Sequence, residues 1–248
     1  MLTTLLCHSF PLFFVMSLIF TLFCDILIPQ ELCQASLADA LDHYLLHDRT
    51  SGRPQRGLLL DVLLGVASGL AHLHRAGVVH GALTPNSILL QKTSLPGGSR
   101  ITVKINDFAL GSLLYPPPGT PGHNNPLGEH SRHPSVVPFY LAPEVALSGL
   151  ASKEGDIFSF GVIMIELFSR VNPYLGIGNG VFERNPHFLS STSEFVPLPV
   201  LLLAESCLAV DPALRPGLDQ VLGNIQVRLM QSFWSDVFSF VSESLPRL

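Results

Sequence analysis

Charged side chains are scarce in this chain of 248 residues. Lysine, arginine, aspartate and glutamate together account for 13% of the sequence, whereas apolar residues account for 47%. Soluble domains average about 25% charged residues, so this share is low. The net charge of −5 also offers no basic surface of the kind that binds nucleic acid. We therefore expect no nucleic acid among the partners of this protein.

Cysteine is sparse as well. The four cysteines are Cys7, Cys24, Cys33 and Cys207. No two of them form a C-x-x-C pair, and none has a histidine at the spacing of zinc ligands. The sequence therefore predicts free thiols in a reducing compartment rather than a zinc site.

The N-terminal segment lacks charge altogether. No Asp, Glu, Lys or Arg occurs from Met1 to Cys24, and the run from Phe10 to Phe23 is almost wholly apolar. Three interpretations stay open. A signal peptide would need a basic start and a small-residue cleavage site, which are both missing. A membrane anchor needs about 20 apolar residues, which this run barely reaches. A mis-started sequence is the third, because Phe, Leu, Ser, Thr and Cys are what pyrimidine-rich non-coding DNA encodes.

Apolar spacing predicts the secondary structure of the remaining chain. A helix is expected from Ser36, as its N-cap, to Leu45, and the late tail from Phe233 to Leu248 has an amphipathic pattern that is typical of a terminal packing helix. Other helices are expected over 58–75, 157–168, 200–208 and 218–229, short strands over 87–91 and 101–105, and a long irregular segment over 113–137.

Five short motifs follow one another along the chain. They are V-H-G-A-L-T-P-N-S-I-L-L at 79–90, V-K-I-N-D-F-A-L at 103–110, Y-L-A-P-E at 140–144, G-D-I-F-S-F-G-V at 155–162 and C-L-A-V-D-P-A-L-R-P at 207–216.

In this order the motifs resemble those of the protein kinase superfamily, in particular tyrosine-kinase-like and receptor-type kinase domains. The first resembles the catalytic loop H-R-D-L-K-P-x-N, the second the D-F-G segment and the third A-P-E. The last two resemble the D-V-W-S-F-G start of the central helix and the C-L-x-x-D-P-x-x-R-P that precedes the last helix of the family. The resemblance implies an α+β, protein-kinase-like fold, represented mainly by its helical large lobe.

Parts of a kinase that hold ATP are missing from the sequence. It has no G-x-G-x-x-G loop and no V-A-I-K-like strand, and its glycine-rich run from Gly176 to Gly180 follows the central helix, where we expect a loop. We therefore predict little or no β small lobe. The expected organisation is an apolar segment over 1–24 (anchor or mis-started sequence), a partial kinase-like domain over 25–230 and a tail over 231–248.

The resemblance also implies that catalytic groups have been lost. Ala82 occupies the position of the aspartate base, and Thr84 and Ser87 replace the lysine and the metal-binding asparagine. A general base contributes about 10²–10⁴-fold, so its loss alone need not abolish activity. Proton transfer, phosphate binding and metal binding are affected together, however, and we expect no catalytic residue in this chain.

Two residues could still face a nucleotide. The resemblance makes Leu89 the floor of an adenine pocket and Asp107 a Mg²⁺ ligand. A lone carboxylate rarely holds Mg²⁺ without nucleotide phosphates. We therefore expect no cofactor unless the chain is part of an active enzyme, in which case ATP and Mg²⁺ are implied.

Other retained residues have architectural roles by resemblance. His80 and Phe108 are expected to stack in an apolar spine. Asp156 is expected to cap the central helix and to accept hydrogen bonds from the backbone of His80 and Gly81. Finally, a buried ion pair is expected between Glu144 and Arg215.

Three functional hypotheses follow. The first is a catalytically impaired pseudokinase that acts as a scaffold or regulator in signalling by binding another protein, with an active kinase as one candidate partner. The second is a truncated form of an active ATP-dependent Ser/Thr or Tyr kinase, and the third is a non-functional gene fragment. The expected location is the cytoplasm, or a membrane reached through the N-terminal segment with the kinase-like part in the cytoplasm.

Overall fold

The computed structural model describes residues 14–17, 28–31, 33–95, 98–106, 137–178, 181–184 and 196–229. Contacts divide the chain into two compact units, Met1–Gln34 and Ala35–Leu248. In the first unit, β1 (Phe14–Ser17) and β2 (Ile28–Glu31) form an antiparallel pair. Most of the apolar N-terminal run lies outside the described residues, so its three interpretations stay predictions.

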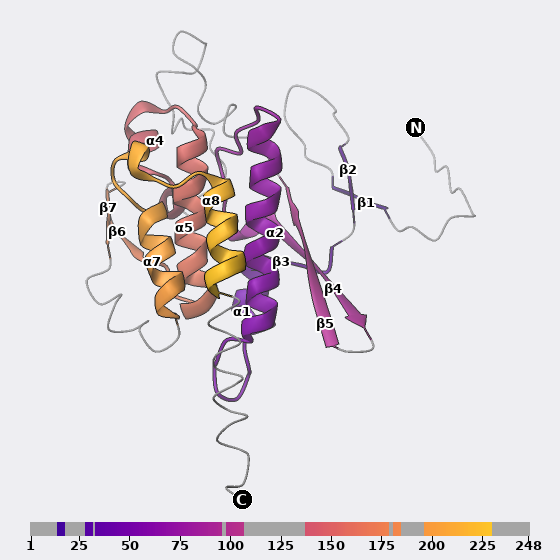
Figure 1. Ribbon diagram of the computed structural model, residues 1–248. Coiled ribbons are helices and arrows are strands. Elements are labelled where there is room, and N and C mark those ends of the chain that lie inside the picture. Colours follow the sequence, from indigo (N-terminus) through magenta and orange to yellow (C-terminus); the bar gives the residue numbers. More distant parts are fainter. Residues whose placement is uncertain are drawn as a thin grey trace, which may run out of the picture. The chain divides into compact units, whose positions relative to one another are not determined.

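The second unit combines several helices with a small antiparallel sheet (Figure 1). Its strands are β3 (Ala35–Ser36), β4 (Ile88–Leu95), β5 (Gly98–Ile105), β6 (Tyr174–Gly178) and β7 (Val181–Arg184). Its α-helices are α1 (Leu37–Asp42), α2 (Arg56–Arg75), α4 (Pro143–Ser148), α5 (Lys153–Ser169), α7 (Leu198–Cys207) and α8 (Leu218–Asn224). Shorter turns are the 3₁₀ segments η1 (Pro85–Ser87), η2 (Val137–Tyr140) and η3 (Pro212–Leu214), and the π-helical η4 (Ile225–Leu229).

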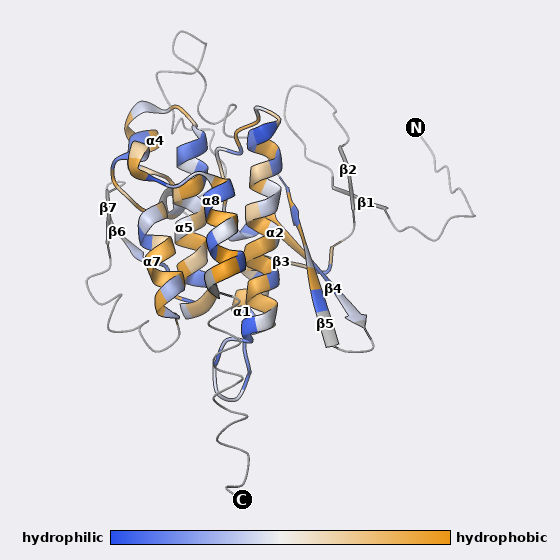
Figure 2. Cartoon of the chain, viewed as in Figure 1, coloured by the Kyte–Doolittle hydropathy of each residue, from blue (hydrophilic) through white to orange (hydrophobic). Residues whose placement is uncertain are grey.

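Helix α5 forms the centre of the core. Almost every residue from Gly155 to Phe168 is buried, as the nearly continuous apolar sequence predicts for a helix that is surrounded by protein. Figure 2 shows hydrophobic residues concentrated along α5 and α2. Helix α2 also has the length and hydropathy of a membrane span, but its apolar residues belong to the core cluster, and core helices of soluble proteins pass the same test.

The α1 helix begins as predicted and ends early. Ser36 is its N-cap: the Ser36 Oγ accepts a hydrogen bond from the Asp39 backbone N–H at 3.1 Å, and Asp39 Oδ2 accepts one from the Ser36 N–H. The helix stops at Asp42 instead of Leu45, because Tyr44 adopts a left-handed conformation with φ of 56°. The guanidinium of Arg170, which also has a positive φ, lies 3.4 Å from the centre of the Tyr44 ring. This contact with the end of α5 has no signal in the local sequence of α1.

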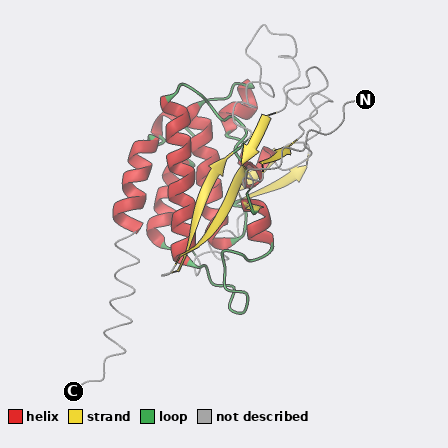
Figure 3. Ribbon diagram, turned by 90° about the vertical axis from the view of Figure 1, so that its right-hand side faces the viewer, coloured by secondary structure: helices red, strands yellow, loops and turns green. Residues whose placement is uncertain are grey.

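The sheet packs on α2 through two glycines of that helix. Strand order is β3-β4-β5, and the long strands β4 and β5 lie along one side of the helical layer (Figure 3). A Cβ at Gly65 would lie 2.6 Å from Val103 Cβ, and one at Gly69 would lie 2.7 Å from Ile105 Cδ1. Non-bonded contacts of a Cβ atom below about 3 Å are essentially never found in proteins. The two glycines therefore set how closely β5 approaches the helix.

One loop prediction was wrong, and the thiol prediction agrees with the described residues. The glycine-rich run at 176–180 is not a simple loop, because β6 and β7 form a hairpin with an irregular register at Gly176 and Gly178. Cys207 is a free thiol, and burial raises its pKa to about 12, which keeps it protonated. Cys7 and Cys24 lie outside the described residues.

A buried histidine lies next to the end of α5. His47 is 1% exposed, its Nε2 lies 3.4 Å from the carbonyl oxygen of Phe168, and its Nδ1 has no hydrogen-bond partner among the described residues. Burial lowers the pKa of His47, and the positive charge of Arg170 lowers it further. The neutral imidazole is therefore the form that fits this position.

We predict that replacing Gly65 by alanine destabilises the protein by about 1–2 kcal/mol. The clash with Val103 costs about 1–3 kcal/mol, and the higher helix propensity of alanine returns less than about 1 kcal/mol. The measurement is urea unfolding of Gly65→Ala beside Gly57→Ala, which lies in the same helix with open space around its Cβ position. Gly57→Ala should be neutral or slightly stabilising. A Gly65→Ala variant as stable as the parent would contradict the close packing.

A second prediction concerns acid stability. An unfolded histidine titrates near pH 6.5, whereas folded His47 resists protonation. Its contribution is therefore fully present above about pH 6.5 and is lost as the pH falls below that value, at up to about 1.4 kcal/mol per pH unit. Unfolding free energies measured from about pH 7.5 to pH 5 should fall less steeply for His47→Gln than for the parent. Equal slopes for His47→Gln and the parent would refute the assignment.

Candidate functional site

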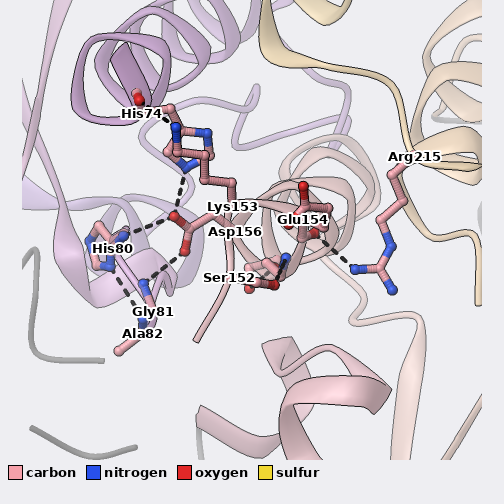
Figure 4. Close-up of polar contacts among 11 residues, drawn as sticks. His74, His80, Gly81, Ala82, Ser152, Lys153, Glu154, Asp156 and Arg215 are labelled. Atoms are coloured by element: carbon pink, nitrogen blue, oxygen red, sulfur yellow. Dashed lines mark hydrogen bonds and ion pairs between the residues drawn. The ribbon is translucent and has the colours of Figure 1, made fainter. Parts of the chain in front are cut away.

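The carboxylate of Asp156 is the centre of the candidate site. Its side chain is 1% exposed. Asp156 Oδ2 accepts hydrogen bonds from the backbone N–H of His80 and from Nε2 of His74, each at 2.8 Å. Asp156 Oδ1 accepts one from the backbone N–H of Gly81, also at 2.8 Å (Figure 4). These bonds join helix α5 to helix α2 and to the loop that precedes η1.

The structure corrects one part of the role expected for Asp156. The N-cap of α5 is Ser152, whose Oγ accepts a hydrogen bond from the Gly155 N–H at 2.9 Å. Asp156 lies within the first turns of the helix, and its carboxylate is fully engaged by the loop. Lys153 in the same turn donates to the carbonyl of His74 at 2.7 Å, which adds a second link between α5 and α2.

Gly81 gives the loop the shape that these bonds require. Its φ is 75°, a left-handed conformation that glycine adopts without a steric penalty. With this turn the successive N–H groups of His80 and Gly81 reach the two oxygens of one carboxylate. The residue that replaces the family arginine therefore supports the backbone geometry while offering no side chain.

His80 links the loop to the segment before Asp107. The Ala82 N–H approaches His80 Nδ1 at 3.3 Å, so Nδ1 is the acceptor and Nε2 carries the hydrogen. His80 Nε2 then donates to the Asn106 carbonyl at 3.0 Å, and the Asn106 N–H donates to the Ser87 carbonyl at 2.8 Å. The two ends of the loop thus hold both backbone groups of Asn106. Asp107 and Phe108 themselves lie outside the described residues, so the metal ligand and the spine partner stay predictions.

Ser87 is committed to its own loop. Its buried Oγ accepts a hydrogen bond from the Thr84 N–H at 3.0 Å and donates one to the Thr84 carbonyl at 2.9 Å. Thr84 is buried too. The residues at the family's lysine and asparagine positions therefore close the turn around η1 instead of projecting toward a ligand.

The described residues offer little that could hold a nucleotide or a metal. Leu89 is half-buried in β4, where it pairs with Ser36, and Ala82 has only a methyl group. A pocket beside Gly81 has a cavity volume of about 10 Å³, which is room for a single water molecule, and is lined by Leu141, Ala142 and the start of α5. No group of three or more His, Cys, Asp or Glu side chains within the described ranges is placed to bind a metal ion.

The expected ion pair between Glu144 and Arg215 is present with both oxygens engaged. Arg215 Nη1 lies 2.6 Å from Glu144 Oε1, and Nη2 lies 2.8 Å from Oε2. The arginine side chain is fully buried, whereas the glutamate side chain is 28% exposed, so the pair is only partly buried. Arg215 also donates to the carbonyl oxygens of Glu154 and Ala209, and it lies 5.0 Å from the ring centre of Phe158. One arginine thus joins α4, the start of α5 and the segment before α8.

Sequence reasoning missed a second polar link to α5. The Tyr140 hydroxyl donates to Glu166 Oε2 at 2.6 Å, and the Tyr140 carbonyl accepts a hydrogen bond from Ser159 Oγ at 2.7 Å. Burial raises the pKa values of both Tyr140 and Glu166. Neither Glu166, within an apolar helix, nor His74, at the end of α2, carries a local signal of its partner. The presence of a polar residue, Glu166, in an otherwise apolar helix indicates only that some polar partner is needed, without saying which one.

Comparison with known proteins agrees with this geometry. A model of the protein tyrosine and serine/threonine kinase family matches residues 20–225. The chain therefore belongs to the protein kinase family, and the predicted mixed α and β kinase-like fold is confirmed.

Individual relatives include enzymes and proteins described as inactive. Dual specificity testis-specific protein kinase 1 of Rattus norvegicus is 30% identical over 177 residues, which cover 69% of this chain and 26% of the relative. A "probably inactive" leucine-rich repeat receptor-like protein kinase of Arabidopsis thaliana is 30% identical over 218 residues, which cover 76% of this chain and 20% of the relative. A G-type lectin S-receptor-like serine/threonine-protein kinase of Arabidopsis thaliana is 33% identical over 136 residues, 54% of this chain and 15% of the relative. The chain thus spans about a quarter or less of the length of these relatives.

We predict that Asp156→Asn destabilises the fold by about 2–4 kcal/mol, because the amide nitrogen would face a buried backbone N–H and leave it without an acceptor. Chemical unfolding monitored by circular dichroism measures this loss. Asp61→Asn is the matched control: Asp61 accepts one bond, from the Ile101 N–H at 3.2 Å, at a half-buried position. Its loss should stay below about 1 kcal/mol. Equal losses for the two variants would show that Asp156 is not the main anchor.

Proposed function

We propose that this chain is a kinase-family domain without phosphotransfer activity that acts as a scaffold by binding another protein. The observation that carries the proposal is the state of Ser87. A Mg²⁺ ligand at this position would have to leave the two hydrogen bonds with Thr84 that close the loop. Mg²⁺ also demands near-ideal octahedral geometry and short distances, which one short hydroxyl side chain meets poorly.

The neighbouring positions support the same conclusion. Ala82 cannot accept the proton of a substrate hydroxyl, and the buried Thr84 cannot place a positive charge beside a phosphoryl group. The polar groups of the loop instead form hydrogen bonds within the loop and with Asp156. Those contacts hold the loop in one conformation without supplying the side chains that phosphotransfer uses.

The partner class follows from what the site retains. Another protein is the proposed partner, with an active kinase as one candidate, and the turn that follows α1, where Tyr44 and Leu45 are exposed, is a candidate contact surface. Receptor-like relatives support a location in the cytoplasm, or at a membrane with the kinase-like part on the cytoplasmic side. The alternative is that the chain is part of an active kinase, as the enzyme names of other relatives allow.

A thermal-shift experiment separates the two functions. For the parent chain we expect no rise in melting temperature on adding ATP with Mg²⁺ compared with ATP and a chelator, because ligands stabilise only the proteins that they bind. Saturation at about 100 times the dissociation constant would add about 2.7 kcal/mol, a shift that the assay resolves easily. Intact mass after incubation with ATP and Mg²⁺ should show no added phosphate.

Two variants sharpen this test. Ser87→Asn restores the family's metal-ligand residue, and Ser87→Ala removes the hydroxyl without supplying a ligand. A magnesium-dependent shift in Ser87→Asn alone would locate the loss of metal binding at this position. A magnesium-dependent shift in the parent, or phosphate added to it, would overturn the proposal in favour of the active kinase.

A further inference from the structure

Helix α7 has an apolar face that the described core does not cover. Leu198 and Leu202 are 64% and 59% exposed and lie one helical turn apart. They are on the side of α7 opposite to the residues that pack inward. Those inward residues are Val200, Leu203, Ala204 and Cys207. Two neighbouring exposed leucines on one helix favour a contact with another apolar element.

An element that covers the exposed face of α7 must begin close to it. Helices α7 and α8 run in opposite directions and are joined at one end through η3 (Figure 1). The end of α8 therefore lies near the start of α7, where both leucines are located. In agreement, η4 at the end of α8 contacts α7, and η4 carries a further exposed apolar residue, Val227. The chain segment that follows η4 thus begins beside α7.

The sequence of that segment suits the face. At 100° per residue, the apolar residues of 230–245 other than Phe240 fall on one side of a helix, and Asp236 and Glu243 fall on the other. A helix of 10 residues, such as α7, is about 15 Å long, and residues 230–245, which precede Pro246, would span more than that in helical form. The residues on the apolar side are Met230, Phe233, Trp234, Val237, Phe238, Val241 and Leu245.

We propose that the C-terminal segment 230–248 of this chain docks on α7, with its apolar side against Leu198 and Leu202. The apolar match favours this occupant: Leu198 and Leu202 form the most exposed part of the outer side, and Glu205 is the one charged residue of α7. The tether favours it as well: a segment that begins next to its docking site meets that site at a high effective concentration. The proposal concerns a surface outside the kinase-like loop and is independent of the function proposed above.

Trp234 provides a direct reporter, because it is the only tryptophan in the chain. In the full-length parent we expect its fluorescence to be blue-shifted and weakly quenched by acrylamide, as for a shielded indole. The double variant Leu198→Ser/Leu202→Ser should shift the emission to the red and raise the quenching constant severalfold. Both side chains are more than half exposed, so the core and the far-ultraviolet circular dichroism should be retained.

Two further variants control the experiment. Leu147→Ser removes another exposed leucine, 90% exposed on α4, and should leave Trp234 unchanged. Val237→Asp alters the segment instead of its docking face and should reproduce the red shift of the double variant. A parent tryptophan that is already solvent-exposed, or one that is unaffected by the double variant, would overturn the proposal. Emission that changes with protein concentration, together with a dimer mass in light scattering, would overturn it in favour of a second copy of the chain.

Discussion

The structure depends on one buried carboxylate. A carboxylate removed from water without partners destabilises a fold by several kcal/mol, so Asp156 is tolerated only because N–H donors from His74, His80 and Gly81 surround it. Two of these donors belong to the backbone of the loop and one to helix α2. The shape of the loop, the orientation of α2 and the start of α5 are therefore set together. From the loop the same constraint extends to Asn106, whose two backbone groups are held by His80 and Ser87.

This arrangement explains how the frame of a kinase loop can persist while its charged side chains are replaced. The bonds that hold the loop use the backbone N–H groups of residues 80, 81 and 82, which every residue except proline supplies. Replacing the family's charged side chains by Gly81 and Ala82 therefore removes reactive groups without removing any of these bonds. Side chains that bear architecture are retained, as the Glu144–Arg215 pair shows. The shape of the loop is separable from its reactive groups because the shape depends on backbone N–H groups, whereas reactivity depends on side-chain atoms.

Much of the fold could be predicted from local sequence. The spacing of apolar residues located α2, α5, α7 and the β4–β5 hairpin to within a few residues, and Ser36 was recognised as the N-cap of α1. Errors arose where a distant contact decided the local shape. Helix α1 ends early, at Asp42, where the distant Arg170 donates to the Leu41 carbonyl and contacts the Tyr44 ring.

The candidate site divides in the same way. The order of the motifs was sufficient to recognise the kinase family and to locate the losses at Ala82, Thr84 and Ser87, because such motifs are read from neighbouring residues. Only the tertiary structure decided that the Ser87 hydroxyl closes its own loop, that Ser152 rather than Asp156 caps α5, and that His74 completes the carboxylate's shell. It also decided that Leu198 and Leu202 face away from the described core. Local spacing specifies which side chains are available, whereas partners separated by tens of residues are chosen by packing, which brings them together only in the folded chain.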